Sequence, residues 1–575
     1  QGTRAGRSCR QARPATPGRR RARGSTAMPR WPLAVVALAG ATAKDVPEPT
    51  CRASGDGACR AADGKAAEQQ HHWPHSRGHL GRYGSTQLVG PRNLTAALAW
   101  RWHHPKLLIF PGAAIIDSTK HIYASAMDGV RKFSPDGRII WHYEPPSLMI
   151  ANPSLMGSRL FGSTWHGHMF AVDIETGKEI WQVQPARDSE MDTPFVEADE
   201  GVVLAVFDKR AEPEPPHMSG NSRIVAVNAS DGKQLWDYQS SRTLWNFMPM
   251  FVGDGSFIIM DIHGGIYRMR VLDGQRVWYT PPPEAYLQSF SDGGVILGPD
   301  ADVAYTCSNH AFGMPLSTGA IRAYSVKDGT LLWDRNLSEP CLSWPAVGGD
   351  GRTVVVPVGP FPLPVPGMLV VLGLSVVLWL PILLLRLLAD LLCRCYCKRP
   401  RARCVRCLAW TNLCLVLWVF LGCPVGLHQL SIWLGPQQHR IWRGVDRPLQ
   451  VVALDAKSGA ERWRYSDIPG WPFLSARGDE ENFWRRVFTW GYSLRPVCGP
   501  ASWSAPTIDG NGTVYAAAMN GYLYAINDAN GDGVIDGSSE VSTLDMGAAS
   551  LHAGMAFAPG IMVFGSCDGV FAFHT

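Results

Sequence analysis

The chain has 575 residues, of which 46% are hydrophobic and 22 are tryptophan, so it can form a large core and is not a wholly disordered protein. Its formal net charge is +5, but a net charge of −10 remains once the eight arginines of residues 1–27, Arg30 and the six basic residues of 393–407 are removed. An acidic main body argues against nucleic acid as a partner.

The first 43 residues carry the signals of protein export. Residues 1–27 contain no acid, and Met28 begins a short apolar stretch that ends in Ala41-Thr42-Ala43. This pattern predicts a leader and signal peptide over residues 1–43, with translation starting at Met28. An uncleaved membrane anchor is the alternative, which the shortness of the apolar stretch disfavours.

A polar segment follows, from residue 44 to residue 96, and its composition predicts disorder. Cys51 and Cys59 are close enough in sequence to form a small disulfide loop in an oxidising compartment. The segment also contains four closely spaced histidines: His71, His72, His75 and His79. They form either a metal-binding group or part of a solvated linker, and the polar surroundings favour the linker.

One hairpin pattern recurs along the rest of the chain. In AVDIETGKEIW, residues 171–181, a strand-like run, a turn containing Gly177 and a second run end in Trp181. Glycine suits a turn that needs positive φ, and tryptophan offers an apolar plate that can pack between neighbouring sheets. Six copies of the pattern end in Trp141, Trp181, Trp236, Trp278, Trp333 and Trp463.

The spacing of these tryptophans predicts a regular array. Successive copies lie 40 to 55 residues apart, except for an interval of 130 residues between Trp333 and Trp463. That interval falls to 41 residues if residues 360–448 are an insertion. A period near 40 with several short strands per repeat is typical of a β-propeller with four-stranded blades.

Shorter inner hairpins precede the outer ones, and eight can be counted. The last ends at Thr575 without an outer strand, which residues 97–105 can supply from the other end of the chain. We therefore expect an all-β, eight-bladed propeller made of residues 97–359 and 449–575 and closed by its N-terminal strand. The seventh blade lacks the tryptophan, and Leu544 is expected in its place.

The outer hairpins resemble the repeats of the pyrroloquinoline-quinone (PQQ) dehydrogenase superfamily, whose pattern is approximately A-x-D-x-x-x-G-x-x-x-W. Ala171, Asp173, Gly177 and Trp181 match it, as does the copy that ends in Trp463. The resemblance implies the PQQ-like propeller fold, which serves dehydrogenases, bacterial outer-membrane assembly lipoproteins and lumenal stress sensors alike. It also implies, for the dehydrogenases, a calcium-bound carboxylate set, a catalytic Asp and often an adjacent Cys-Cys disulfide. This sequence has no Cys-Cys pair and no residues that match the quinone site, so PQQ is not favoured as a cofactor.

The insertion, residues 360–448, contains two apolar runs without charge, 368–385 and 407–427. They predict transmembrane helices over about 368–390 and 407–427, because neither run has the polar face of a helix buried in a globular core. The loop between them, residues 393–407, is basic and contains no acid, so the positive-inside rule places it in the cytoplasm. The propeller is then lumenal or extracellular, on the side to which the signal peptide directs it.

The loop of residues 393–407 also contains five cysteines. Cys393, Cys395 and Cys397 are candidates for acylation beside the membrane, with zinc binding and free thiols as alternatives. The basic residues favour membrane lipid as a partner.

Four sequons for N-glycosylation lie in the predicted lumenal part, at Asn93, Asn228, Asn336 and Asn511. Four cysteines of the same part can pair, although the sequence does not determine how: Cys307, Cys341, Cys498 and Cys567.

The segment DANGDGVIDGSSE, residues 528–540, resembles a calcium loop of EF-hands and dockerins. Oxygen ligands at alternate positions, with a glycine at the sixth, can wrap a calcium ion. The candidate ligands are Asp528, Asn530, Asp532, Asp536 and Glu540, although Glu540 falls one position beyond the usual acid. The alternative is a turn rich in Asp, Asn and Gly that binds no ion.

Polar residues also occupy the turns of the inner hairpins, which equivalent blades would place on one face of the ring. They are Asp128, His166, His168, His263, His310, Asn520 and Asp568. They either converge on a ligand or form turns, and the turn-forming role is favoured. The sequence thus favours a membrane-anchored binding or assembly scaffold with a protein partner on a propeller face. A PQQ-dependent oxidoreductase and a lumenal sensor are the alternatives, and no catalytic residues can be assigned.

Overall fold

The computed structural model describes most of the two predicted propeller segments, together with part of the segment before them. The described residues are 52–53, 71–79, 84–106, 114–189, 195–209, 220–283, 291, 294–310, 318–360, 384, 387–388, 448–471, 476–479, 497–498, 502–550 and 554–575. All of them belong to one compact unit, residues 39–575.

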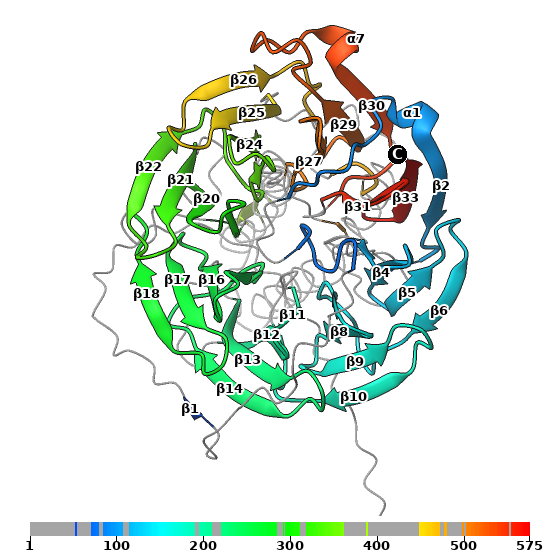
Figure 1. Ribbon diagram of the computed structural model, residues 1–575, viewed down its shortest axis with the longest axis vertical. Coiled ribbons are helices and arrows are strands. Elements are labelled where there is room, and N and C mark those ends of the chain that lie inside the picture. Colours follow the sequence, from blue (N-terminus) through cyan, green and yellow to red (C-terminus); the bar gives the residue numbers. More distant parts are fainter. Residues whose placement is uncertain are drawn as a thin grey trace, which may run out of the picture. The chain divides into compact units, whose positions relative to one another are not determined.

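Eight antiparallel sheets surround a common axis, one for each blade of the predicted propeller (Figure 1). Blade 1 contains β3 (Ile115–Ile116), β4 (Ile122–Ala126), β5 (Gly129–Phe133) and β6 (Ile139–Tyr143). Blade 2 contains β7 (Ser154–Met156), β8 (Arg159–Ser163), β9 (Met169–Asp173) and β10 (Glu179–Val183). Blade 3 contains β11 (Glu197–Asp199), β12 (Val202–Lys209), β13 (Asn221–Asn228) and β14 (Gln234–Gln239), with β1 (Arg52–Ala53) added to its outer edge. Blade 4 contains β15 (Met250–Phe251), β16 (Ser256–Met260), β17 (Ile266–Arg270) and β18 (Arg276–Thr280).

The second half of the ring follows the same order. Blade 5 contains β19 (Val295–Leu297), β20 (Val303–Asn309), β21 (Gly319–Ser325) and β22 (Leu331–Asn336). Blade 6 contains β23 (Ala346–Val347), β24 (Thr353–Val358), β25 (Gln450–Asp455) and β26 (Glu461–Tyr465). Blade 7 contains β27 (Thr507–Ile508), β28 (Val514–Ala517), β29 (Tyr522–Ile526) and β30 (Val541–Asp545), with the short α7 (Gly537–Glu540) between the last two. Blade 8 contains β31 (Ala556–Ala558), β32 (Ile561–Gly565), β33 (Gly569–His574) and β2 (Leu98–His103), which follows α1 (Leu94–Ala97).

The N-terminal strand closes the ring, as predicted. β2 pairs with β33 in antiparallel register, for example Trp102 with Val570, and completes the blade of the last hairpin. Leu544 is buried on β30, the strand that lacks the repeated tryptophan. The eight-bladed, all-β fold is therefore confirmed, and β2 covers the edge of β33 that would otherwise be open.

The strand order gives the ring two distinct faces. In every blade the second strand ends, and the third strand begins, at one face, which we call the inner-turn face. The turns between the third and fourth strands lie on the other, the outer-turn face, which also carries the acidic loop of residues 527–540.

The prediction of disorder for residues 44–96 is wrong for residues 71–79 and 84–96, because much of this stretch is buried among the innermost strands. The backbone of Trp73 exchanges two hydrogen bonds with Ile116, of 2.8 and 2.9 Å. Farther along, Ile508 of blade 7 bonds to Gly84 and Thr86. In Figure 1 these blue segments lie at the centre of the ring. We call residues 71–79 and 84–90 the axial segment.

Two polar side chains of the axial segment, His75 and Arg77, are buried as well. His75 Nδ1 lies 3.1 Å from Glu197 Oε2, and both side chains are at most 5% exposed. Arg77 donates hydrogen bonds of 2.6 Å to the carbonyl oxygens of Pro345 and Pro506. The axial segment therefore connects blade 3 with the start of blades 6 and 7, through polar groups that the sequence alone suggested were solvated.

The predicted membrane insertion lies almost wholly outside the described residues. Within the described part of the chain, no helix has the length and apolar character needed to cross a bilayer. The strands on either side of the insertion are described: β24 and β25 pair along their whole length, from Thr353 with Asp455 to Val358 with Gln450. Blade 6 is therefore a complete sheet around the insertion.

Candidate functional site

The acidic loop of blade 7 joins β29 to β30 on the outer-turn face. Its side chains bond chiefly to nearby backbone groups: Asp528 Oδ2 accepts from Gly533 N–H at 3.2 Å, and Asp532 Oδ1 accepts from Val534 N–H at 2.8 Å. Such bonds are typical of Asx turns. They explain locally how a sequence rich in Asp, Asn and Gly forms this loop.

Glu540 fixes the end of the loop. Its two carboxylate oxygens accept hydrogen bonds from the backbone N–H groups of Ala529, at 2.9 Å, and Asp536, at 3.0 Å. The bond from Asp536, followed by other backbone bonds, holds the pKa of Glu540 below its usual value. Glu540 therefore remains a carboxylate at neutral pH and ties both sides of the loop together.

The five predicted calcium ligands are not gathered around one point. Among the residues that the structure describes, no group of three or more His, Cys, Asp or Glu side chains is arranged to share a metal ion. One atom nevertheless fits a ligand role, because Asp528 Oδ1 is buried and makes no hydrogen bond. A buried carboxylate oxygen without a partner is costly, and a bound cation would satisfy it.

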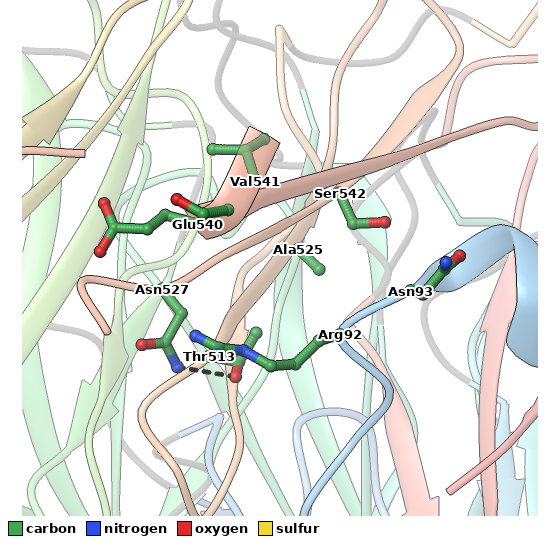
Figure 2. Close-up of a pocket in the computed structure, with 9 residues that line it drawn as sticks. Arg92, Asn93, Thr513, Ala525, Asn527, Glu540, Val541 and Ser542 are labelled. Atoms are coloured by element: carbon green, nitrogen blue, oxygen red, sulfur yellow. Dashed lines mark hydrogen bonds between the residues drawn. The ribbon is translucent and has the colours of Figure 1, made fainter. Parts of the chain in front are cut away.

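A pocket of about 300 Å³ lies beside the loop, between blade 7 and the segment that leads to α1 (Figure 2). It is lined by Arg92, Asn93, Thr513, Ala525, Asn527, Ser539, Glu540, Val541 and Ser542. Asn527 Nδ2 donates to Thr513 Oγ1 at 2.9 Å, and Arg92 extends toward this pair in Figure 2. Hydroxyl, amide, carboxylate and guanidinium groups suit a small polar ligand better than an apolar one.

The polar residues of the inner turns lie on one face but bond to neighbours near their own blades. Asp128 accepts two hydrogen bonds from Arg131, of 2.7 and 2.6 Å, and lies 3.2 Å from His104. Burial opposes ionisation of Asp128, but the bonds from Arg131 and His104 hold its pKa well below the usual value. In blade 2, His166 Nδ1 likewise lies close to a carboxylate, 3.1 Å from Asp188 Oδ1.

The remaining inner-turn residues follow this pattern. His168 is 3.2 Å from Thr164, His310 is 2.9 Å from Asn336, Asn520 donates to Tyr524 at 3.0 Å, and Asp568 accepts from Ser566 at 2.8 Å. His263 is buried, and its backbone N–H donates to Asp261 at 2.9 Å. These contacts are typical of residues that form turns, and they do not bring the side chains together at a ligand site around the axis.

Asp261 is a buried carboxyl that sequence reasoning missed. It accepts hydrogen bonds of 2.9 Å from the backbone of His263 and Gly265 and from the Tyr267 hydroxyl. Burial raises the pKa of Asp261 to about 6, against the effect of these bonds. The sequence shows only Asp-Ile-His-Gly-Gly over residues 261–265, which is the composition of an ordinary turn.

Four cysteines of the propeller form two disulfides, Cys307–Cys341 and Cys498–Cys567, with Cα–Cα distances of 5.8 and 5.9 Å. Cys567 lies in the inner turn of blade 8, and Asn309 at the end of β20 bonds to the backbone of Cys341. Both disulfides therefore lie at the inner-turn face. The sequence could not give this pairing, because each bond joins residues 34 or 69 positions apart.

The sequon asparagines differ in their surroundings. Asn93, Asn336 and Asn511 are exposed, and Asn93 also lines the pocket. Asn228 is partly buried, and its side chain accepts bonds of 2.8 and 2.6 Å from the backbone and hydroxyl of Ser230. The acylation candidates Cys393, Cys395 and Cys397 lie outside the described residues, as does the rest of the basic loop 393–407, whose cytoplasmic location stays a prediction.

Comparison with known proteins finds relatives among propellers. A family model described as outer membrane protein assembly factor BamB matches residues 126–292 and 217–345. The BamB assembly factor of Nitrosomonas eutropha is 24% identical over 226 residues, which are 38% of this chain and 49% of that protein. The chain thus spans about half the length of this curated relative.

Two solved structures share the fold. Quinohemoprotein alcohol dehydrogenase from Comamonas testosteroni gives a TM-score of 0.52 at 11% identity, covering 89% of this chain and 81% of that chain. Quinohemoprotein alcohol dehydrogenase ADHIIG from Pseudomonas putida gives 0.50 at 10% identity, covering 88% and 80%. At such low identities, the structural similarity establishes the fold and leaves the activity open. The repeated glycine–tryptophan hairpins and the matching family model show that this chain is similar, over residues 126–345, to the PQQ-like repeat β-propeller family, and its eight blades form the same kind of propeller.

Proposed function

We propose that the protein is a membrane-anchored scaffold whose propeller binds a protein partner in a lumenal or extracellular compartment. The observation that carries this proposal is the use of the chain's own residues at the centre of the ring. Trp73 pairs with the innermost strand of blade 1, and Arg77 bonds to the residues before blades 6 and 7. Because the chain's own residues pair with these inner positions, we expect a partner to bind the inner-turn or outer-turn face rather than the axis.

The disulfides support an oxidising compartment. Cys307–Cys341 and Cys498–Cys567 both lie within the propeller, and such bonds persist in secreted and lumenal proteins. This favours the side of the membrane to which the predicted signal peptide over residues 28–43 directs the propeller. The basic loop 393–407 is then the cytoplasmic part.

The relation to an assembly factor supports a binding role. The Nitrosomonas eutropha relative is an outer membrane protein assembly factor. The family model of such factors matches residues within blades 1 to 5 of this chain. We carry over only the general role of binding other proteins. The predicted membrane hairpin over about 368–390 and 407–427 would keep such a scaffold at the membrane.

Calcium is the cofactor that we propose for the acidic loop. Asp528 offers the buried, unbonded Oδ1, and Asp532 and Glu540 lie on the same loop. Bound calcium would be structural, because it would neutralise like-charged carboxylates and order the long turn of blade 7.

The direct test is mass spectrometry of the full chain purified in mild detergent, with and without chemical cross-linking. We expect a co-purifying protein cross-linked to a propeller face and no stoichiometric quinone. A stoichiometric quinone, or oxidation of alcohols or sugars with an electron-accepting dye, would instead establish the dehydrogenase alternative. Purification from a strain that lacks quinone biosynthesis controls for adventitious quinone.

A further inference from the structure

The insertion of residues 360–448 leaves the propeller at one defined point. Val358, the last residue of β24, pairs with Gln450, the first residue of β25. Next to this pair, a β-carbon on Gly359 would lie 2.6 Å from Leu449 Cδ2, so the two chain ends are in contact. The whole insertion therefore replaces a single turn between the second and third strands of blade 6.

That turn belongs to the inner-turn face. Strands of a propeller blade run between the two faces, so both ends of the insertion leave along the strand direction, away from the outer-turn face. Residues 359–367 precede the first apolar run, which begins at Met368. Even a fully extended chain of nine residues spans only about 30 Å.

We infer that the inner-turn face of the propeller lies against the bilayer and that the outer-turn face points away from it. This inference rests on the proposed membrane hairpin and adds an orientation to it. The acidic loop and the pocket beside Arg92 then face the aqueous compartment, where a protein partner can reach them. The two disulfides lie on the membrane side, where they stiffen the face that carries the tether.

Blades 1 and 2 provide matched positions that distinguish the two faces. Glu144 follows β6 at the inner-turn face, whereas Asp136 precedes β6 at the outer-turn face; their side chains are 75% and 62% exposed. Asp188 bonds to the inner turn of blade 2 and is 62% exposed, whereas Glu175 in the outer turn of that blade is 67% exposed. All four residues are acidic, so each replacement changes the charge equally.

The test is energy transfer from the propeller to labelled lipid. The full chain is reconstituted in phosphatidylcholine vesicles that contain a rhodamine-labelled headgroup lipid, with one of the four residues replaced by a fluorescent amino acid. Because a five-residue strand rises about 17 Å, we expect transfer about twofold more efficient from positions 144 and 188 than from positions 136 and 175.

Two outcomes contradict the inference, and they are distinguishable. If the chain does not float with vesicles in a density gradient, the anchoring and the orientation both fail. If the chain floats but transfer is equal within each pair, or stronger from positions 136 and 175, the orientation alone is wrong and the anchor stands. Each labelled variant must retain the thermal unfolding midpoint of the unlabelled chain, which guards against local unfolding.

Discussion

Gly177 packs against the indole ring of Trp141, which belongs to the preceding blade. A β-carbon on Gly177 would lie 2.8 Å from Trp141 Cγ, and the Trp141 indole N–H donates to the carbonyl of Ile174 at 3.1 Å. The same relation between a turn glycine and the tryptophan of the preceding blade recurs at Gly137–Trp100, Gly232–Trp181, Gly274–Trp236, Gly329–Trp278 and Gly459–Trp333. The repeat pattern thus encodes contact between blades.

We expect Gly177→Ala to destabilise the propeller by about 2–4 kcal/mol, through overpacking against Trp141 and the cost of alanine at positive φ. Gly157→Ala is the matched control in the same blade. Gly157 also has positive φ, of 57°, but a β-carbon there would meet no atom within 4 Å. The Gly157→Ala substitution should destabilise the propeller by only about 1 kcal/mol, because it strains the backbone and meets no side chain. Chemical denaturation measures both, and equal losses would show that the glycine–tryptophan contact contributes little.

The glycine–tryptophan period made the blades predictable from sequence, because each contact depends on residues at fixed local spacing. The axial segment was not predictable in this way. His75 contacts Glu197 and Arg77 contacts Pro506, which are 122 and 429 positions away. No local pattern distinguishes such buried polar residues from those of a solvated linker. For the same reason, the sequence could identify the acidic loop but not the pocket that Arg92 helps to line.

Arg77→Ala is expected to loosen the axial segment. Burial lowers the pKa of the Arg77 guanidinium to about 9, so the side chain is still charged at neutral pH and depends on the carbonyls of Pro345 and Pro506. Its removal leaves two carbonyl oxygens without these bonds, at a cost of about 2–4 kcal/mol. Hydrogen exchange of residues 71–79 and 84–90 should accelerate in the variant.

Arg138→Ala provides the control for this experiment. The Arg138 side chain is 79% exposed and pairs with Asp136 on the surface, so its loss should change stability by less than about 0.5 kcal/mol. Unchanged exchange in the Arg77 variant would mean that the axial segment is held by its backbone pairing alone.

Stability should depend on the ionisation of Asp261. In the folded chain the pKa of Asp261 is about 6, above the value near 4 of an unfolded carboxyl, so the folded state binds more protons between these values. The free energy of unfolding therefore falls as the pH rises from 4 to 6, and the loss persists above pH 6.

Asp261→Asn removes the buried charge and keeps an oxygen for the backbone of His263 and Gly265. We expect a gain in stability of up to about 2–3 kcal/mol at pH 8 and little change at pH 4, as urea denaturation at the two pH values would measure. Asp136→Asn, on the surface, should give no such gain at pH 8. If Asp261→Asn instead lowers the free energy of unfolding at pH 8, the charge of Asp261 stabilises the folded state.

Calcium should raise the unfolding temperature of the chain. At a concentration 100-fold above the dissociation constant, an ion that binds only the folded state adds about 2.7 kcal/mol. We expect chelation to reverse the effect and Asp528→Asn to abolish it, because this variant changes the carboxylate with the unbonded oxygen. Asp231→Asn, in the outer turn of blade 3 beside Lys233, should retain the full response. An identical response in the Asp528 variant would place the ion elsewhere.

Protease protection tests the proposed anchored scaffold most directly. In sealed microsomes that contain the full chain, protease added from the cytosolic side should cut within residues 393–407 and leave both propeller segments intact. The two fragments should then remain associated through the pairing of β24 with β25 and of β2 with β33. Cleavage within the propeller, with residues 393–407 protected until detergent is added, would contradict the account.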